Sequence, residues 1–345
     1  MSHYVTNERM NQLIKELERE YRIFAPKRFK KRGWKPDTDS IRYAEIKSLE
    51  EIVHDEVSDF SPKEVFFPIM QSLFFFTGGG CSESAVDNKE IILFARPCDI
   101  NGIRRLDTIF LKNGASEDFF YKRLRDKLKI FMIECRECWE NCFCLSMDSS
   151  KTTDYSVAVR FAANHLLVKV KDLAFEKYFS KEPIKEFTPK FVRSNHGKAR
   201  LPNINGPDDL KKAYELKLWK DIDEKCLNCG ACSAVCITCS CFDTTDIIYD
   251  ETSPDGERRR VWASCMNEDF TLMAGGHSVR KTAGERMRFR VLHKIHDYKA
   301  RFGVENMCVG CGRCDNRCPG EISFFGTINA LSDALEKKEN AAEGV

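Results

Sequence analysis

Two runs of four cysteines give the C-terminal third of the sequence its chemistry. Both have the spacing C-x2-C-x2-C-x3-C, and they comprise Cys226, Cys229, Cys232 and Cys236, then Cys308, Cys311, Cys314 and Cys318. This spacing is typical of paired cubane 4Fe–4S clusters, because one loop offers three thiolates to one cube and its fourth cysteine ligates the other cube. The pattern therefore predicts one cluster on Cys226, Cys229, Cys232 and Cys318, and a second on Cys308, Cys311, Cys314 and Cys236.

Zinc sites and disulfide bonds are the alternative uses of these cysteines. A structural zinc site needs four ligands, usually as two C-x2-C pairs, and has no use for two identical four-cysteine runs. Disulfides suit small secreted chains. Residues 1–10 are polar and contain neither the apolar segment of a signal peptide nor a twin-arginine pair. We therefore expect a cytoplasmic chain whose thiols serve as metal ligands.

The composition of the 345 residues narrows the class of partner. The formal net charge is +2, so the chain lacks the strongly basic balance of a nucleic-acid-binding protein. No apolar stretch reaches the roughly 18 residues that a membrane span needs. The length suggests about two domains. We place their boundary in residues 183–207, which are rich in proline and poor in apolar side chains.

Five further cysteines follow two predicted strands in the N-terminal half. Residues 91–95 and 129–133 are apolar runs of strand length, and residues 100–110 between them have helical spacing. A strand–helix–strand order favours parallel strands, whose carboxyl ends share one edge of the sheet. The cysteines that follow these strands are Cys98, Cys135, Cys138, Cys142 and Cys144. We favour a third iron–sulfur site on Cys98, Cys135, Cys142 and Cys144, with buried thiols or a zinc site as the alternatives.

Other elements are predicted from periodicity and turn residues. Residues 6–24 have the spacing of an amphipathic helix, with Thr6 as its N-cap and Pro26 beyond its end. Residues 157–161 and 166–170 predict a hairpin. Residues 268–302 predict a helix that is broken near Gly275 and Gly276. The many Lys and Arg residues of that helix predict either a solvated face or a basic face that docks a partner or raises cluster potentials.

The expected fold class is α+β. Residues 1–205 form an N-terminal mixed α/β domain with the extra iron–sulfur site. Residues 206–334 form an all-α ferredoxin-like domain with two 4Fe–4S clusters, because a long helical insert separates the two motifs. Residues 335–345 are expected to be a disordered tail. Cys239, Cys241 and Cys265 exceed the eight ligands and are expected to line the clusters or to pack.

Several motifs together resemble one family of iron–sulfur subunits. They are Arg96-Pro97-Cys98-Asp99, Cys142-Phe143-Cys144, both cysteine runs, Cys239-Ser240-Cys241, Trp262-Ala263-Ser264-Cys265 and Ala274-Gly275-Gly276-His277. The combination resembles the iron–sulfur electron-transfer subunit of anaerobic sulfite reductase, and it is similar to the β (iron–sulfur) subunit of soluble NAD(P)-linked NiFe hydrogenases. Ile237 departs from the family pattern, in which a proline commonly follows the fourth cysteine, as Pro319 does in the second run.

The resemblance implies an electron-transfer subunit of an oxidoreductase complex, with no catalytic residue of its own. It would relay electrons from a flavin-containing, NAD(P)H-oxidising subunit to a sirohaem subunit that reduces sulfite to sulfide. The same relay in a soluble NiFe hydrogenase is the first alternative. A non-catalytic iron–sulfur redox sensor is an alternative of another class, although the sequence contains no recognisable output module such as a helix-turn-helix.

Overall fold

The computed structural model describes residues 1–343, which form two units that are each assembled from separate stretches of the chain. Unit 1 contains Met1–Arg136, Thr152–Phe191 and Ser240–Ala263. Unit 2 contains Glu137–Lys151, Val192–Cys239 and the described residues from Ser264 onward. The prediction was a single boundary near residue 205, but two segments belong to the unit on the other side of it. Residues 137–151 pack against the second cysteine run, and residues 240–263 pair with a strand of the N-terminal half.

A seven-stranded sheet forms the core of unit 1. Its order is β1-β9-β8-β7-β6-β2-β3, in which β2, β6, β7 and β8 are parallel and the outer strands are antiparallel. The strands are β1 Ser2–Thr6, β2 Tyr21–Phe29, β3 Ser40–Glu45, β6 Glu90–Ala95, β7 Leu128–Ile133, β8 Val157–Phe161 and β9 His165–Val170. Their inward side chains, with those of α1 (Asn7–Leu17), make the hydrophobic core. The predicted hairpin of β8 and β9 is confirmed.

The predicted crossover with its cysteine-bearing ends is also present. Strands β6 and β7 are parallel neighbours, joined through α3 (Pro97–Leu111) and α4 (Phe119–Arg125). Cys98 is the second residue of α3 and comes three residues after the end of β6, and Cys135 comes two residues after the end of β7. The carboxyl ends of parallel neighbours lie at one edge of the sheet, which is where α/β proteins usually hold ligands.

The first helix is shorter than predicted. Thr6 is its N-cap, as expected, and accepts a hydrogen bond from the backbone N–H of Arg9. The helix ends at Leu17, however, and residues from Tyr21 onward form strand β2. Tyr21, Ile23 and Ala25 alternate into the core with 6 % exposure or less. A helical and an alternating pattern overlap at Tyr21, so its apolar side chain fitted both.

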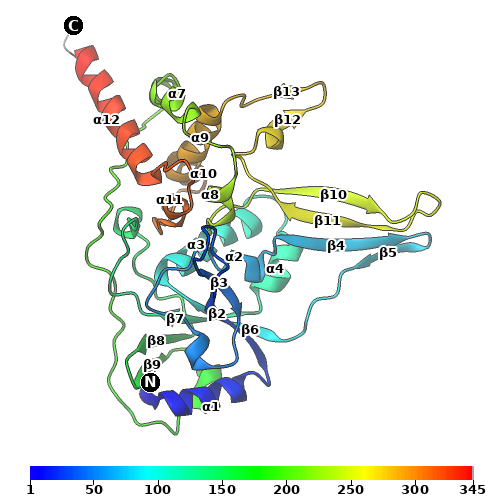
Figure 1. The fold of residues 1–345 in the computed structure, drawn as a ribbon, viewed down its shortest axis with the longest axis vertical. Helices are drawn as coiled ribbons and strands as arrows, with labels where there is room; N and C mark the ends of the chain where they lie inside the picture. Colours follow the sequence, from blue (N-terminus) through cyan, green and yellow to red (C-terminus); the bar gives the residue numbers. More distant parts are fainter. Residues whose placement is uncertain (344–345) are drawn as a thin grey trace. The chain divides into compact units, whose positions relative to one another are not determined.

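A four-stranded ribbon, in the order β10-β11-β4-β5, completes unit 1 (Figure 1). Its strands are β4 Met70–Thr77, β5 Gly80–Glu83, β10 Phe242–Ile248 and β11 Gly256–Trp262. Strands β10 and β11 belong to the insert between the cysteine runs, and β11 pairs with β4. Arg260 of β11 is 3 % exposed and donates to Asp118 at 2.8 Å, while its guanidinium lies 4.9 Å from the centre of the Phe67 ring.

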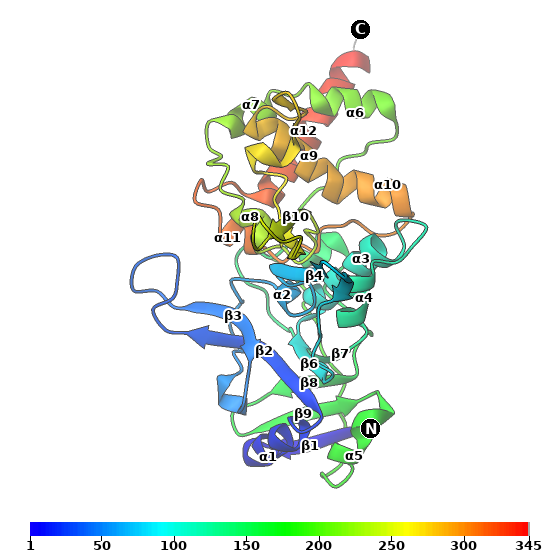
Figure 2. The same cartoon turned by 90° about the vertical axis from the view of Figure 1, so that its right-hand side faces the viewer.

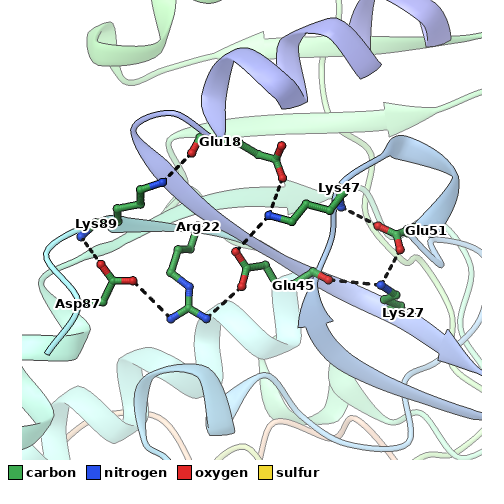
Figure 3. Close-up of polar contacts among 8 residues, drawn as sticks. All are labelled: Glu18, Arg22, Lys27, Glu45, Lys47, Glu51, Asp87 and Lys89. Carbon is green, nitrogen blue, oxygen red and sulfur yellow. Dashed lines mark hydrogen bonds and ion pairs between the residues drawn. The ribbon is translucent and has the colours of Figure 1, made fainter.

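Charged side chains link α1, β2, β3 and the segment before β6 (Figure 3). The ion pairs are Arg22–Glu45, Arg22–Asp87, Lys47–Glu18, Lys47–Glu45 and Lys27–Glu51. Lys89 adds a hydrogen bond to the backbone oxygen of Glu18 at 3.0 Å. Partly exposed pairs of this kind each contribute about 0–1 kcal/mol, so the network mainly fixes how these segments meet rather than stabilising the core.

Unit 2 is mostly helical. Its helices are α6 Pro207–Tyr214, α7 Leu218–Asp223, α8 Ala231–Ala234, α9 Ala283–Leu292, a π-helix His293–Asp297, α10 Tyr298–Phe302, α11 Arg313–Asn316 and α12 Phe324–Glu343. Helix α9 packs against α7 and α12 (Figure 2). The approach to α7 is close, because a Cβ on Gly284 would lie 1.9 Å from the backbone oxygen of Trp219.

The insert between the cysteine runs is less helical than predicted. The helix expected over residues 268–302 begins at Ala283. Before it come a 3-10 turn, Glu268–Thr271, and a hairpin of β12 (Leu272–Met273) and β13 (His277–Ser278). Gly275 and Gly276 form the turn of this hairpin with φ of +84° and +78°. Residues 206–334 thus include β10 to β13, which differs from the predicted all-α domain.

The C-terminal end of the described chain also differs from the prediction. Helix α12 continues to Glu343, and within it Ile328, Leu331 and Leu335 repeat at helical spacing and are 5 % exposed or less. Part of the predicted disordered tail is therefore helical, and residues 344 and 345 lie outside the described range. Within residues 1–343, no helix is both long and apolar enough to cross a membrane.

Candidate functional site

A cavity in unit 2 brings together cysteines from both runs. Its lining includes Cys226, Cys229, Cys232, Cys314 and Cys318, and it encloses about 490 Å³ of space between atoms, open solvent included. Four of these five are the ligand set predicted for one cluster: three cysteines of the first run and the last cysteine of the second. The rest of the lining is largely apolar, with Met266, Met287, Ile322 and Phe324 among its side chains.

Each cysteine run has the same local construction. A glycine with left-handed backbone, Gly230 at φ +69° or Gly312 at φ +73°, precedes a four-residue helix. Helix α8 carries Cys232 and α11 carries Cys314, and the two helices pack against each other. The fourth cysteine of each run follows its helix. Two similar turns in contact therefore offer each fourth cysteine to the partner run, as paired cubanes require.

The second predicted ligand set is also close together. Burial, followed by the charges of neighbouring groups that include Cys236 and Cys311, raises the pKa of the Cys308 thiol to about 12. Burial likewise raises the pKa of Cys314, with Cys236 and Cys311 again among the contributing neighbours. A buried thiol with a raised pKa becomes a thiolate when a metal binds it. The backbone N–H of Gly310 points at the Cys308 sulfur at 3.3 Å, which is the kind of contact that tunes a cluster.

The described residues do not contain three Cys, His, Asp or Glu side chains that converge on a single ion. A single-ion zinc site needs four ligands at about 2.0–2.3 Å from one atom. A cubane places each thiolate on a different iron, so its ligands surround a larger volume.

Two buried cations are the feature of this site that best matches an anionic cofactor. Arg290 of α9 and Lys294 of the π-helix are 1 % and 3 % exposed. Arg290 donates to the Cys232 backbone oxygen at 2.9 Å and to the Ser233 hydroxyl at 3.0 Å. Its Nε, also buried, has no hydrogen-bond partner among the described atoms. Buried charges are costly unless they are paired, and iron–sulfur clusters with four thiolates carry negative charge. The thiol set and these cations therefore fit such a cluster.

Cys239 belongs to the surroundings of the second ligand set. A hydrogen bond between the Cys239 and Cys236 side chains lowers the pKa of Cys236. Arg290 in turn donates to the Cys239 sulfur at 3.3 Å. Burial alone would lower the pKa of Lys294, but the sulfurs of Cys236 and Cys239 outweigh it and raise that pKa. Sequence reasoning grouped Cys239 with the surplus cysteines and did not single out Arg290 or Lys294, although their i, i+4 spacing places them on one helix face.

The N-terminal cysteines are divided between the two units. Cys142 and Cys144 belong to unit 2, where the Phe143 backbone N–H donates to the Gly310 oxygen at 2.8 Å. The Cys142 thiol lies 3.7 Å from the backbone oxygen of Cys311. Two of the four cysteines proposed for a third site therefore contact the second run directly. The other two, Cys98 and Cys135, belong to unit 1, at the carboxyl ends of β6 and β7.

Comparison with known proteins agrees with this geometry. Residues 225–322 match the family described as a 4Fe-4S dicluster domain, a range that contains both cysteine runs. The chain is also similar to subunit beta of sulfhydrogenase 2 from Pyrococcus furiosus. The two sequences are 30 % identical over 310 residues, which cover 85 % of this chain and 90 % of the relative. The similarity thus includes the N-terminal half as well as the cysteine runs. This chain is an iron–sulfur protein that belongs to the same family as the sulfhydrogenase beta subunit.

Proposed function

We propose that the chain is the electron-transfer subunit of a cytoplasmic, hydrogenase-type oxidoreductase complex. It would hold two 4Fe–4S clusters, one on Cys226, Cys229, Cys232 and Cys318 and the other on Cys236, Cys308, Cys311 and Cys314. The observation that carries the proposal is the cavity in which Cys318 joins three cysteines of the first run. An exchange of the fourth ligand between two runs is the arrangement of two-cluster ferredoxins.

The residues around these thiols have roles in binding and insulation rather than in bond making. An iron–sulfur cluster supplies one-electron transfer at a potential that its surroundings set. The backbone N–H groups of Gly310 and Ile322 point at the Cys308 and Cys318 sulfurs, at 3.3 Å and 3.4 Å. Met287 and Phe324 help to exclude water from the cavity. A substrate that reacts by two electrons needs a different subunit, so we assign the chain no catalytic residue.

The hydrogenase-type complex is favoured over the sulfite reductase by the sulfhydrogenase relative. In it the chain would receive electrons from, or return them to, a flavin-containing subunit that handles NAD(P)H, and a nickel–iron subunit would handle hydrogen. The sulfite reductase is the second candidate, because the sequence motifs around Cys98 and Cys142 resemble the iron–sulfur subunit of that enzyme. There the catalytic partner would be a sirohaem subunit that reduces sulfite.

Metal and cofactor analysis of the native complex tests this proposal. The complex would be purified without oxygen and analysed for nickel, sirohaem and iron. Nickel without sirohaem is the expected result. Sirohaem without nickel would overturn the hydrogenase-type proposal in favour of sulfite reduction. If the chain is purified without partner subunits and with neither nickel nor sirohaem, both candidate functions are overturned.

The iron content of the isolated chain tests the number of clusters. A third site on Cys98, Cys135, Cys142 and Cys144 stays a prediction from the sequence. Three cubanes contain about 12 irons per chain and two contain about 8. A value near 8 would remove the third site and leave the other two in place.

A further inference from the structure

Two buried cations lie on one face of the helix that passes the cysteine runs. Arg290 and Lys294 are four residues apart, at the end of α9 and in the π-helix that continues it. Their side chains are nearly inaccessible to water, yet no carboxylate of residues 1–337 forms an ion pair with either of them. Asp315 lines the same cavity as Arg290, at a distance that does not make an ion pair. Buried charges without a close partner are strongly destabilising. Their position therefore implies that negative charge is present nearby in the working protein.

The two cations differ in the proposed ligand-bearing residues to which they are hydrogen-bonded. Arg290 lines the cavity that contains Cys226, Cys229, Cys314 and Cys318, and it donates to the backbone oxygen of Cys232 and to the sulfur of Cys239. The proposed ligand-bearing residue to which it donates a hydrogen bond is Cys232, which favours the first cluster.

Lys294 contacts the second set. Its ammonium group donates to the Thr238 hydroxyl at 2.8 Å, and that hydroxyl lies 3.4 Å from the Cys236 sulfur. The backbone oxygen of Lys294 also accepts from the Cys308 N–H at 3.2 Å. Cys236 and Cys308 are both proposed ligands of the second cluster, so the Lys294 side chain and its backbone both lie near the proposed site of that cluster.

We propose that Arg290 and Lys294 set the reduction potentials of the two clusters separately. Arg290 sets the potential of the first cluster, whose proposed ligands are Cys226, Cys229, Cys232 and Cys318. Lys294 sets the potential of the second cluster, whose proposed ligands are Cys236, Cys308, Cys311 and Cys314. Each added electron increases the negative charge of a cluster. A fixed cation in a low-dielectric site stabilises the reduced form more than the oxidised form, and so raises the potential. Neither residue is catalytic, since each acts only through its charge. The inference rests on the proposed function of electron transfer.

Charge-neutralising variants of each residue test the separation. The full complex would be purified anaerobically with Lys294→Gln or Arg290→Gln, and the midpoint potentials of both clusters would be followed by EPR during a redox titration. Each variant is expected to lower one midpoint potential, and the two variants are expected to lower different ones. Lys294→Arg and Arg290→Lys keep the positive charge, so both clusters should have their wild-type midpoint potentials in these two variants. Lys299→Gln removes an exposed cation from α10 and should move neither potential.

Two results would overturn the inference. In the first, both neutral variants keep full iron content and wild-type midpoint potentials. In the second, the same cluster shifts in both variants, which would refute the assignment of one cation to each cluster. If a glutamine variant loses iron, Lys294→Met removes the charge with an apolar side chain of similar length, which buried sites often tolerate better. Iron loss in the methionine variant as well, with Lys294→Arg intact, would make the charge an assembly requirement and refute its role in setting potential.

The test also separates this inference from the proposed function. The function fails if the wild-type complex lacks iron–sulfur signals or carries neither nickel nor sirohaem. The inference fails when those signals are present and the potentials do not respond to Arg290 and Lys294.

Discussion

Replacing Gly310 by alanine should destabilise unit 2 by more than its unusual backbone alone explains. Gly310 has φ +60°, a conformation that costs an alanine about 1–2 kcal/mol. A Cβ there would lie 2.6 Å from the carbonyl carbon and oxygen of Phe143 and 2.7 Å from the amide nitrogen of Cys144. These are backbone atoms, so relief requires the 142–144 segment to move. Overpacking of this kind adds about 1–3 kcal/mol, which gives a total of about 2–5 kcal/mol.

Gly303 provides the matched control for this prediction. It ends α10 with φ +65°, and apart from its own chain neighbours no described atom lies within 4 Å of the position of its Cβ. Gly303→Ala should therefore cost only the conformational part, about 1–2 kcal/mol. Both variants would be compared by urea unfolding of the anaerobically purified chain, followed by circular dichroism, with iron content measured in parallel. If Gly310→Ala is no less stable than Gly303→Ala, residues 142–144 do not pack closely on the second cysteine run.

Three further predictions concern charge, pH and ligation. Arg260→Met should destabilise unit 1 by about 3 kcal/mol in urea unfolding, because the partly buried Asp118 loses its partner. Arg258 is exposed, so Arg258→Met should cost less than about 1 kcal/mol in the same assay. Burial lowers the pKa of His293 from 6.5 to about 4. At pH 5 the unfolded chain thus binds a proton at His293 that the folded chain does not, so lowering the pH from 7 to 5 should cost about 2 kcal/mol of stability. His293→Phe should lose this part of the pH dependence. Equal losses of stability in the wild-type protein and the variant would contradict the assignment of this pH dependence to His293. Cys318→Ser should remove the same EPR signal as Cys226→Ser, and loss of two different signals would refute the exchanged ligand.

The cysteine spacing and the parallel strands were predictable because both depend on short stretches of sequence. Two motifs of 11 residues carry the proposed ligands, and the apolar run at residues 91–95 was sufficient to predict β6. Cys98 and Cys135 were placed at strand ends by the same local reasoning, and the sheet has them there. Local patterns failed where two periodicities fitted one residue, as at Tyr21, which begins a strand rather than ending a helix.

The rest depended on partners far away in the chain. Residues 242–262 form strands because β11 has β4 beside it, about 190 residues earlier in sequence, and no local pattern shows such a neighbour. For the basic residues of α9, the sequence left two alternatives open, a solvated face and a face that docks a partner or raises cluster potentials. Arginine and lysine on a helix normally indicate a solvated face, and only the structure shows that Arg290 and Lys294 are buried while Lys281 is exposed.

The interleaving of the two units has a consequence for the order of biosynthesis. Unit 1 cannot complete its ribbon until β11 has left the ribosome, by which time the first cysteine run has also been made. Until then, the aromatic strand β4 lacks its main neighbour, and an unpaired strand of this kind invites aggregation. Unit 2 likewise needs residues 137–151 from the first half and the second run from the end. Strand β4 is therefore exposed to aggregation for much of the synthesis, and unit 2 can bring its two cysteine runs together only when the chain is nearly complete.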